Sequence, residues 1–313
     1  MNENNLIVSV SPHYHKKGAT TQRVMLDVLI ALVPALIASV VIFGVRSLMV
    51  VGVSAVNCVL LETLWNKLMK KPHTYGDLSA VVTGVLLAYN VPVGMPIWQL
   101  LVGDFIAIII VKMLFGGLGC NFVNPALVGR VTMMLSFTGS MTAYATNVAK
   151  VDVLSTATPL SAMSRLNFSH LTTLLLGQHG GMLGETCALA LILGGVYLCV
   201  RGVIKPTIPA VYVGSVFVFT FLFNGFDATA AVLSLFSGGL MLGAIFMATD
   251  YVTSPMTGKG RVIFALGCGF LTTCIRLFAS SAEGVSFAIL LMNLLVPYIN
   301  DGTRTKPLGG VAA

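Results

Sequence analysis

Long apolar stretches separated by short polar ones run through almost the whole chain. A bilayer-spanning helix needs roughly 20 apolar residues, and ten stretches approach that length. We expect spanning helices at residues 24–45, 48–66, 78–93, 96–115, 124–138, 183–201, 206–224, 231–248, 262–280 and 284–300. The third and fifth are short, because Pro92 ends one early and Gly139 closes the other. This pattern predicts an all-α integral membrane protein with about ten transmembrane helices.

The composition agrees with that prediction. Of 313 residues, 56% are hydrophobic and 9% are charged, whereas soluble domains carry roughly 25% charged residues. In such a protein the net charge of +7 does not indicate nucleic-acid binding. The first twenty residues are polar, so we expect the first spanning helix to act as the insertion signal. His13 and His15 lack Cys or carboxylate partners nearby, and no metal site is predicted.

Lys and Arg residues mark alternate connections between the expected helices. The even-numbered connections and both tails carry Lys16, Lys17, Arg23, Lys67, Lys70, Lys71, Lys112, Arg201, Lys205, Lys259, Arg261, Arg304 and Lys306. The odd-numbered connections carry only Arg46, Lys150 and Arg165. Because short cytoplasmic connections are enriched in basic residues, we expect both termini in the cytoplasm, as an arm of residues 1–23 and a tail of residues 301–313.

A long polar segment, residues 139–182, separates two blocks of five expected helices, residues 24–138 and 183–300. An odd number of spans in each block inserts the second block upside down relative to the first. Such inverted repeats place their binding sites near the middle of the membrane, where short or broken helices meet. We therefore expect two inverted five-helix repeats, joined by an outward-facing loop.

Ionisable residues at membrane depth are costly and are therefore candidates for function. Asp104 lies well inside the fourth expected helix, Glu62 in the later part of the second, and Asp250 where the eighth ends. Arg130 and Arg276 are the buried bases. In one interpretation these acids and bases pair with each other. In the other, unpaired carboxylates form an ion path, since a hard cation such as Na⁺ prefers oxygen ligands.

A glycine-rich break at residues 115–120 is followed by two asparagines, Asn121 and Asn124. The amide of Asn offers both donors and acceptors, which suit the edge of a flat heterocycle with urea-like groups. Alternatively, the pair caps the fifth expected helix, which would then begin at Pro125. On spacing alone the cap is favoured.

The long loop contains one stretch with the residue types of a modification site. Asp152, Ser155 and Thr158 are spaced three apart, and Pro159 keeps the backbone extended. A modifying enzyme could hold such a segment and reach the Thr158 hydroxyl. On composition alone, however, it is an ordinary polar loop. The six cysteines contain no CxxC pair and are expected to be small buried hydrophobes.

Four stretches of the chain resemble the NqrB/RnfD family. This family includes RnfD of the Rnf electron-transport complex and, more distantly, NqrB of the Na⁺-translocating NADH:quinone reductase. The resemblance covers roughly residues 6–308. The matching stretches are residues 11–13 with 23–25 and 31–35, residues 115–119 with 124–126, residues 155–160 and residues 248–253. The third stretch is the most specific.

The resemblance implies two flavins. In the family an acid, a hydroxyl residue three on and an acceptor three further form a flavinylation signal, which here reads Asp152, Ser155 and Thr158. A separate flavin transferase would join FMN through its phosphate to the Thr158 oxygen. A second, non-covalent flavin, riboflavin, is implied near the cytoplasmic side, where Asn121 and Asn124 match the residues associated with its site.

The resemblance also ranks the candidates for an ion path. Glu62 and Asp250 match acidic positions linked to Na⁺ passage in the reductase relative, whereas no family acid is matched by Asp104. Two positions depart from the family pattern. Thr156 replaces a Gly of the reductase branch and offers a second hydroxyl, and Tyr251 stands where Pro is expected.

The implied function is that of a flavoprotein subunit in a bacterial cytoplasmic membrane. With Rnf subunits A, B, C, E and G, it would pass electrons between reduced ferredoxin and NAD⁺ while Na⁺ or H⁺ is exported. The chain alone would be inactive, because it carries no nucleotide-binding or iron–sulfur motif. Two alternatives remain open from the residues: a small-solute channel or transporter of inverted-repeat fold, and a scaffold that only positions its neighbours.

Overall fold

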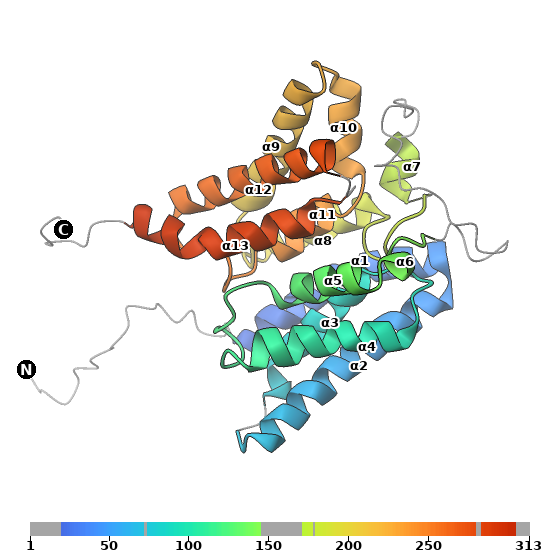
Figure 1. Cartoon of the computed structure of the whole chain (residues 1–313), viewed down its shortest axis with the longest axis vertical. Helices are drawn as coiled ribbons and strands as arrows, with labels where there is room; N and C mark the ends of the chain where they lie inside the picture. Colours follow the sequence, from blue (N-terminus) through green and yellow to red (C-terminus); the bar gives the residue numbers. More distant parts are fainter. Residues whose placement is uncertain (1–19, 72–73, 145–170, 178, 280–282, 305–313) are drawn as a thin grey trace, which may run out of the picture.

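The computed structural model describes residues 20–71, 74–144, 171–177, 179–279 and 283–304, and within them the regular elements are helices (Figure 1). In chain order they are α1 (Thr21–Phe43), α2 (Val45–Leu68), η2 (Tyr75–Asp77), α3 (Ser79–Tyr89), α4 (Ile97–Phe105), η3 (Ile106–Met113), α5 (Pro125–Ser136), α6 (Thr138–Met141), α7 (Leu171–Leu176), α8 (Ala188–Val200), α9 (Thr207–Phe223), α10 (Ala228–Phe236), α11 (Leu240–Leu242), η6 (Gly243–Met247), α12 (Gly258–Phe278) and α13 (Val285–Gly302). The predicted flavinylation signal, Asp152, Ser155 and Thr158, lies outside the described residues.

Four helices of the described chain, α1, α2, α12 and α13, are each long and apolar enough to cross a membrane. A fifth span results if α10 and the α11–η6 helix, which meet at 65°, are counted as one. Helices α3, α8 and α9 are apolar but shorter. The described part of the chain is therefore all-helical, with the apolar helices of a multi-pass membrane protein, as the hydrophobic pattern predicted.

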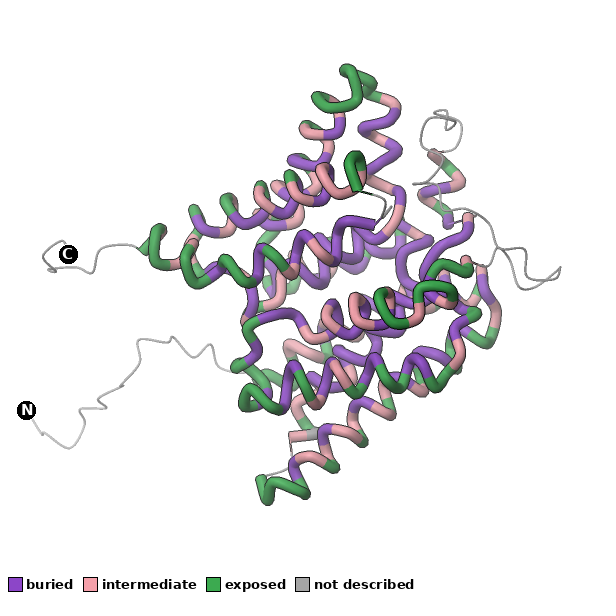
Figure 2. Tube along the Cα trace, in the orientation of Figure 1, coloured by how far each residue is buried: buried purple, intermediate pink, exposed green. Residues whose placement is uncertain are grey.

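Helix α3 is buried over nearly its whole length by the helices around it (Figure 2). Its 11 residues correspond to about 16 Å at 1.5 Å per residue, roughly half of the 30 Å hydrocarbon core. The short third helix that the sequence predicted thus ends at Tyr89, and the chain leaves it through residues 90–96 without regular helix. The end of α3 lies inside the molecule.

The sixth expected helix begins later than predicted. Residues 183–187 are not helical, and α8 begins at Ala188. Two backbone N–H groups of this segment instead bond the chain near the end of α3. The N–H of Gly184 donates to the carbonyl of Tyr89, the last residue of α3, at 2.9 Å, and the N–H of Leu183 donates to the carbonyl of Val91 at 3.1 Å. Gly184 permits this approach, because a Cβ there would lie 2.3 Å from Tyr89 Cβ. Pairing with α3 replaces the first helical turn.

The eighth expected helix, residues 231–248, is broken rather than continuous. Gly238 has a φ of +68°, which a glycine adopts readily. The carbonyls of Ser234 and Ser237, freed at the break, accept hydrogen bonds from Arg276 at 2.8 and 3.0 Å. The guanidinium thus satisfies backbone groups that a continuous helix would have satisfied itself.

Every second connection between successive expected helices lies at the same end of the bundle. Arg201, after α8, bonds Asp27 near the start of α1 at 3.1 Å, and Tyr251 donates to the carbonyl of Val203. The start of α12 meets the end of α13 through the Thr257 and Thr303 hydroxyls, 2.6 Å apart. This end carries connections that the sequence predicted to be cytoplasmic.

The two blocks meet along their first and last helices. Helix α1 packs against α8, and α5 packs against α13. At the first of these contacts Gly194 lies so close to α1 that a Cβ would be 2.2 Å from the Ala31 carbonyl oxygen. Small residues permit such close approach of helices in lipid, and the glycines of this region serve helix packing.

Candidate functional site

A pocket lies between the two blocks at the end of the bundle that gathers these connections. It has about 790 Å³ of space between the atoms, including the part open to the surroundings. Its walls are mainly apolar side chains of α1, α3, α5, α8 and η6. The polar residues among its lining are Ser79, Thr83, Lys112, Asn121, Asn124, Thr249, Asp250 and Tyr251. Apolar walls with a few converging polar groups are typical of small-molecule sites.

Asn124 is the N-cap of α5, as its spacing before Pro125 predicted. Its Oδ1 accepts from the N–H groups of Ala126 at 3.1 Å and Leu127 at 3.3 Å, which have no partner within the helix. Its Nδ2 donates to the carbonyl of Met247, at the end of η6, at 3.3 Å. Asn124 therefore caps α5, joins the two blocks and lines the pocket at once.

Asn121 lies on the same wall of the pocket and is also buried. Its Nδ2 donates to the carbonyl of Val123 at 3.0 Å, which fixes the turn before α5. The structure thus brings the two asparagines to one site, and capping does not exclude ligand contact. Both interpretations of the asparagine pair are compatible with this geometry.

Asp250 follows shortly after η6, at the end of the eighth expected helix, and it lines the pocket. Its carboxylate accepts from the Thr253 hydroxyl at 3.1 Å and from the N–H of Val252 at 3.5 Å. Burial raises the pKa of Asp250 above its usual value, and these two hydrogen bonds only partly oppose the effect. No Lys, Arg or His of the described residues forms an ion pair with it.

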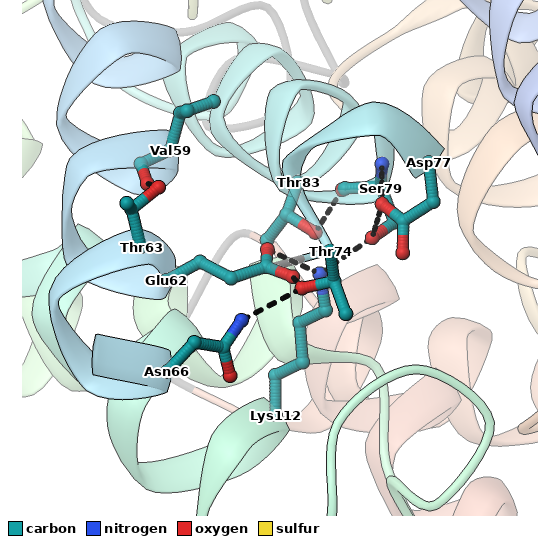
Figure 3. Close-up of polar contacts among 9 residues, drawn as sticks. All are labelled: Val59, Glu62, Thr63, Asn66, Thr74, Asp77, Ser79, Thr83 and Lys112. Carbon is teal, nitrogen blue, oxygen red and sulfur yellow. Dashed lines mark hydrogen bonds and ion pairs between the residues drawn. The ribbon is translucent and has the colours of Figure 1, made fainter. Parts of the chain in front are cut away.

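Glu62 belongs to a buried polar network at the pocket's edge (Figure 3). Lys112, on η3, donates to its carboxylate at 2.9 Å and to the Ser79 hydroxyl at 2.6 Å. The Thr74 hydroxyl donates to the other carboxylate oxygen and accepts from Asn66 at 2.9 Å. Lys112 was predicted to belong to a connection, but it lies within a helix with 2% exposure. It is retained there because Glu62 balances its charge.

Asp104 is fully buried on α4, apart from the pocket. The Ser54 hydroxyl lies 2.6 Å from one carboxylate oxygen, and Asn57 donates to the other at 3.0 Å. Both partners are on α2. In the part of the chain that the structure describes, no basic side chain forms an ion pair with Asp104.

A third charged cluster was not foreseen from the sequence. Arg130, on α5, forms ion pairs with Glu185, at 2.8 Å, and with Glu283. It also donates to the Asn90 side chain at the end of α3. Glu185, which follows Gly184, precedes α8, and Glu283, which is followed by Gly284, precedes α13. An acid shortly before an apolar stretch was the available signal.

Some of the buried acids and bases pair with each other, and some of the acids have no such partner, so each of the two interpretations holds for part of the set. Glu62 is paired with Lys112, and Arg130 with the two unforeseen glutamates, whereas Arg276 bonds backbone carbonyls. Asp104 and Asp250 have no cationic partner among the described residues. The pocket collects Asn121, Asn124 and Asp250 and reaches Glu62 through Lys112, and it leaves Asp104 outside.

A protein-family model described as the NQR2, RnfD, RnfE family matches residues 7–309. Curated relatives match over nearly their whole length. The chain is 44% identical to the D component of the Na(+)-translocating ferredoxin:NAD(+) oxidoreductase complex of Acetobacterium woodii, over 99% of this chain and 97% of the relative.

Two further relatives differ from the first in the ion that their names give. The Clostridium ljungdahlii protein, named as the D component of a proton-translocating ferredoxin:NAD(+) oxidoreductase complex, is 38% identical over 98% of this chain and 97% of its own. The D component of the ion-translocating oxidoreductase complex of Actinobacillus succinogenes is 35% identical over 96% of both chains. The similarity thus extends over the whole of this chain.

Proposed function

Because the chain belongs to the NQR2, RnfD, RnfE family, we propose that it is a membrane flavoprotein subunit of a redox-driven ion pump of the Rnf type. It passes electrons through covalent FMN on Thr158 and through riboflavin in the pocket. The complex links oxidation of reduced ferredoxin and reduction of NAD⁺ to export of an ion. The other Rnf subunits, A, B, C, E and G, supply the nucleotide and iron–sulfur sites.

The pocket between the blocks is the observation that carries this proposal. Asn121 and Asn124 present amide groups among apolar walls, and these match the polar edge and the flat apolar body of a riboflavin ring. Lys112 adds a buried positive charge to the lining. A flavin supplies the electron-transfer chemistry when bound, while residues of the chain hold the ring, exclude water and set the local charge.

FMN on Thr158 is proposed from the spacing of Asp152, Ser155 and Thr158 in the long loop. A flavin transferase forms a phosphoester between the FMN phosphate and the Thr158 oxygen during maturation. The tether retains the flavin on the outer face, where a free cofactor would diffuse away. Thr156 carries a hydroxyl close to Thr158 but lacks this spacing, so it serves as the control position.

Ion coupling is proposed to involve acids of this chain, with Asp250, Glu62 and Asp104 as candidates. Asp250 lines the pocket proposed for riboflavin. Reduction of a flavin there can change the ion affinity of Asp250 only if the two redox states interact differently with the bound ion. The charge of Glu62 is already balanced by Lys112, so Glu62 would bind an ion by exchanging the Lys112 ammonium for it. The relatives are named for Na⁺ and for protons, and the proposal covers either ion.

We place the chain in a bacterial cytoplasmic membrane as ten spans in two inverted repeats, with both termini cytoplasmic. The gathering of Arg201, Tyr251 and the end of α13 at one end of the bundle supports this arrangement. The short helix α3 and the broken α10–α11 helix occupy the third position in each block. Such interrupted helices are typical of inverted-repeat membrane proteins.

The covalent flavin is tested by fluorescence of the denatured chain in a gel. Wild type, Thr158→Ala and Thr156→Ala are each expressed with the flavin transferase. We expect fluorescence in wild type and Thr156→Ala and none in Thr158→Ala. A dark wild-type band, with the transferase active on a known substrate, would exclude covalent FMN and favour the solute-channel alternative.

The riboflavin site is tested separately in the Thr158→Ala background, where covalent FMN is absent. Flavin released by denaturing the purified protein is identified by chromatography. We expect about one riboflavin per chain, and a loss when Asn121→Leu removes the amide from the pocket wall. The matched control is Asn57→Leu, which removes a helix amide outside the pocket. Equal riboflavin in all three proteins would place the ligand elsewhere.

A further inference from the structure

The Ser54 hydroxyl lies between two acceptor oxygen atoms. It is 2.6 Å from Asp104 Oδ1 and 2.9 Å from the backbone carbonyl oxygen of Gly84. Ser54, Gly84 and Asp104 come from α2, α3 and α4. A Cβ on Gly84 would lie 2.8 Å from the Ser54 carbonyl oxygen, so α2 and α3 are held close together here.

A serine hydroxyl has one proton to donate. If Asp104 were ionised, both neighbours of the hydroxyl would be acceptors, and one of the two short contacts would bring two oxygen lone pairs together. If Asp104 carries a proton, every hydrogen has a place. Asp104 then donates to Ser54, Ser54 donates to the Gly84 carbonyl, and Asn57 donates to Asp104 Oδ2 at 3.0 Å.

The charges around Asp104 favour the same state. Asp104 has 0% exposure, and an unpaired carboxylate in such surroundings is strongly disfavoured. The titratable side chains facing this region among the described residues are Cys58 on α2 and Lys112 on η3. Lys112 is engaged by Glu62 at 2.9 Å, and the Cys58 thiol is itself a donor. Neither supplies a free positive charge.

We propose that Asp104, Ser54 and Gly84 form a proton-binding site within the membrane domain, occupied at neutral pH. One proton joins the Asp104 carboxylate, and no electron or other bond is exchanged. Release of that proton requires Ser54 to turn from the Gly84 carbonyl toward the carboxylate, which removes a link between α2 and α3. Because Thr83 and Leu86 of α3 line the pocket, the proton and the pocket act on the same helix.

The role of this site in ion transport rests on the proposed function, whereas its protonation does not. Infrared spectra of the purified chain in nanodiscs at pH 7 therefore provide the test. We subtract the spectrum of Asp104→Asn from that of wild type. The difference spectrum should contain the C=O band of a carboxylic acid, and this band should shift in D₂O. Asn can replace this acid in shape and hydrogen bonding, so the variant retains the fold.

Two further variants make the assignment specific. Asn57→Leu removes the donor to Asp104 Oδ2, and we expect the carboxylic band to move to higher frequency rather than disappear. Glu62→Gln is the matched control, because a glutamate paired with Lys112 contributes a carboxylate band to the difference spectrum. Together they distinguish a proton held at Asp104 from one held by any buried acid.

Other results would overturn the proposal. A wild type minus Asp104→Asn spectrum with only carboxylate bands at pH 7 would show an ionised Asp104. A carboxylic band lost when NaCl replaces choline chloride would identify a Na⁺ site formed by the same oxygens. A chain that carries no flavin in the gel assay would end the proposed redox function but leave these infrared results unchanged.

Discussion

Lys112 donates a hydrogen bond of 2.9 Å to Glu62, and each side chain is only 3% exposed. The two residues are 50 positions apart in the chain and lie on η3 and α2. Their contact turns two charges that would be costly in lipid into a neutral pair with further partners in Ser79 and Thr74. It also connects a predicted ion-path acid to the pocket wall.

Breaking this pair is expected to destabilise the protein strongly. Lys112→Met leaves the Glu62 carboxylate buried without a cation, and Glu62→Gln leaves the ammonium unpaired. Each single change should lower the free energy of unfolding by about 3–5 kcal/mol. Combining both changes should cost less than their sum, because no charge then remains. Unfolding in detergent with increasing sodium dodecyl sulfate, followed by the fluorescence of Trp65 and Trp98, measures the four proteins. Strictly additive losses would contradict the pairing.

Arg130 is expected to matter more than either of its acids. Arg130→Gln leaves both Glu185 and Glu283 without their shared guanidinium, and should cost at least the same 3–5 kcal/mol. Glu283→Gln removes one of two carboxylates and leaves Glu185 paired at 2.8 Å, so its effect should be smaller. The same unfolding titration compares them. A larger loss for Glu283→Gln would mean that the cluster is held by that acid.

The close contact between α1 and α8 predicts that alanine in place of Gly194 and alanine in place of Gly214 change the stability in opposite directions. A Cβ at Gly194 would meet the Ala31 backbone oxygen at 2.2 Å, whereas nothing lies within 4 Å of one at Gly214 on α9. Gly194→Ala should therefore destabilise by about 1–3 kcal/mol through overpacking. Gly214→Ala should stabilise by up to about 1 kcal/mol from helix propensity. Thermal unfolding of both variants tests the prediction, which fails if they behave alike.

Asp250 gives a prediction about pH. Burial raises the pKa of its carboxyl in the folded chain above the usual 3.8, so the folded state holds the proton to a higher pH than the unfolded state. The stability that this provides is fully present below pH 3.8 and is lost as the pH rises through the raised pKa. Asp250→Asn should therefore gain stability over wild type as the pH increases.

The measurement for Asp250 is the melting temperature of both proteins from acidic to neutral pH. The difference between Asp250→Asn and wild type should grow with pH and then level off above the folded pKa. Asp301→Asn, a change at an exposed acid at the end of α13, should show no such growth. A constant difference across the range would mean that Asp250 titrates normally.

The sequence by itself determined the features that depend on near neighbours. Apolar stretches set most of the helices, because an apolar segment of sufficient length has no better environment than lipid. Asn124 before Pro125 fixed the start of α5, since a cap is completed by the next three residues. The position of Asp104 inside an apolar stretch marked it as an unusual acid, and its side chain is buried in the structure.

Only the tertiary structure decided which charges meet. Glu62 is paired because η3 packs beside α2, and Arg130 because α5 approaches the residues that precede α8 and α13. The break at Gly238 is stable because Arg276, from another helix, satisfies its carbonyls. Pairing, breaks and the pocket are determined by residues far apart in the chain, whose distances follow from how helices pack and not from local sequence.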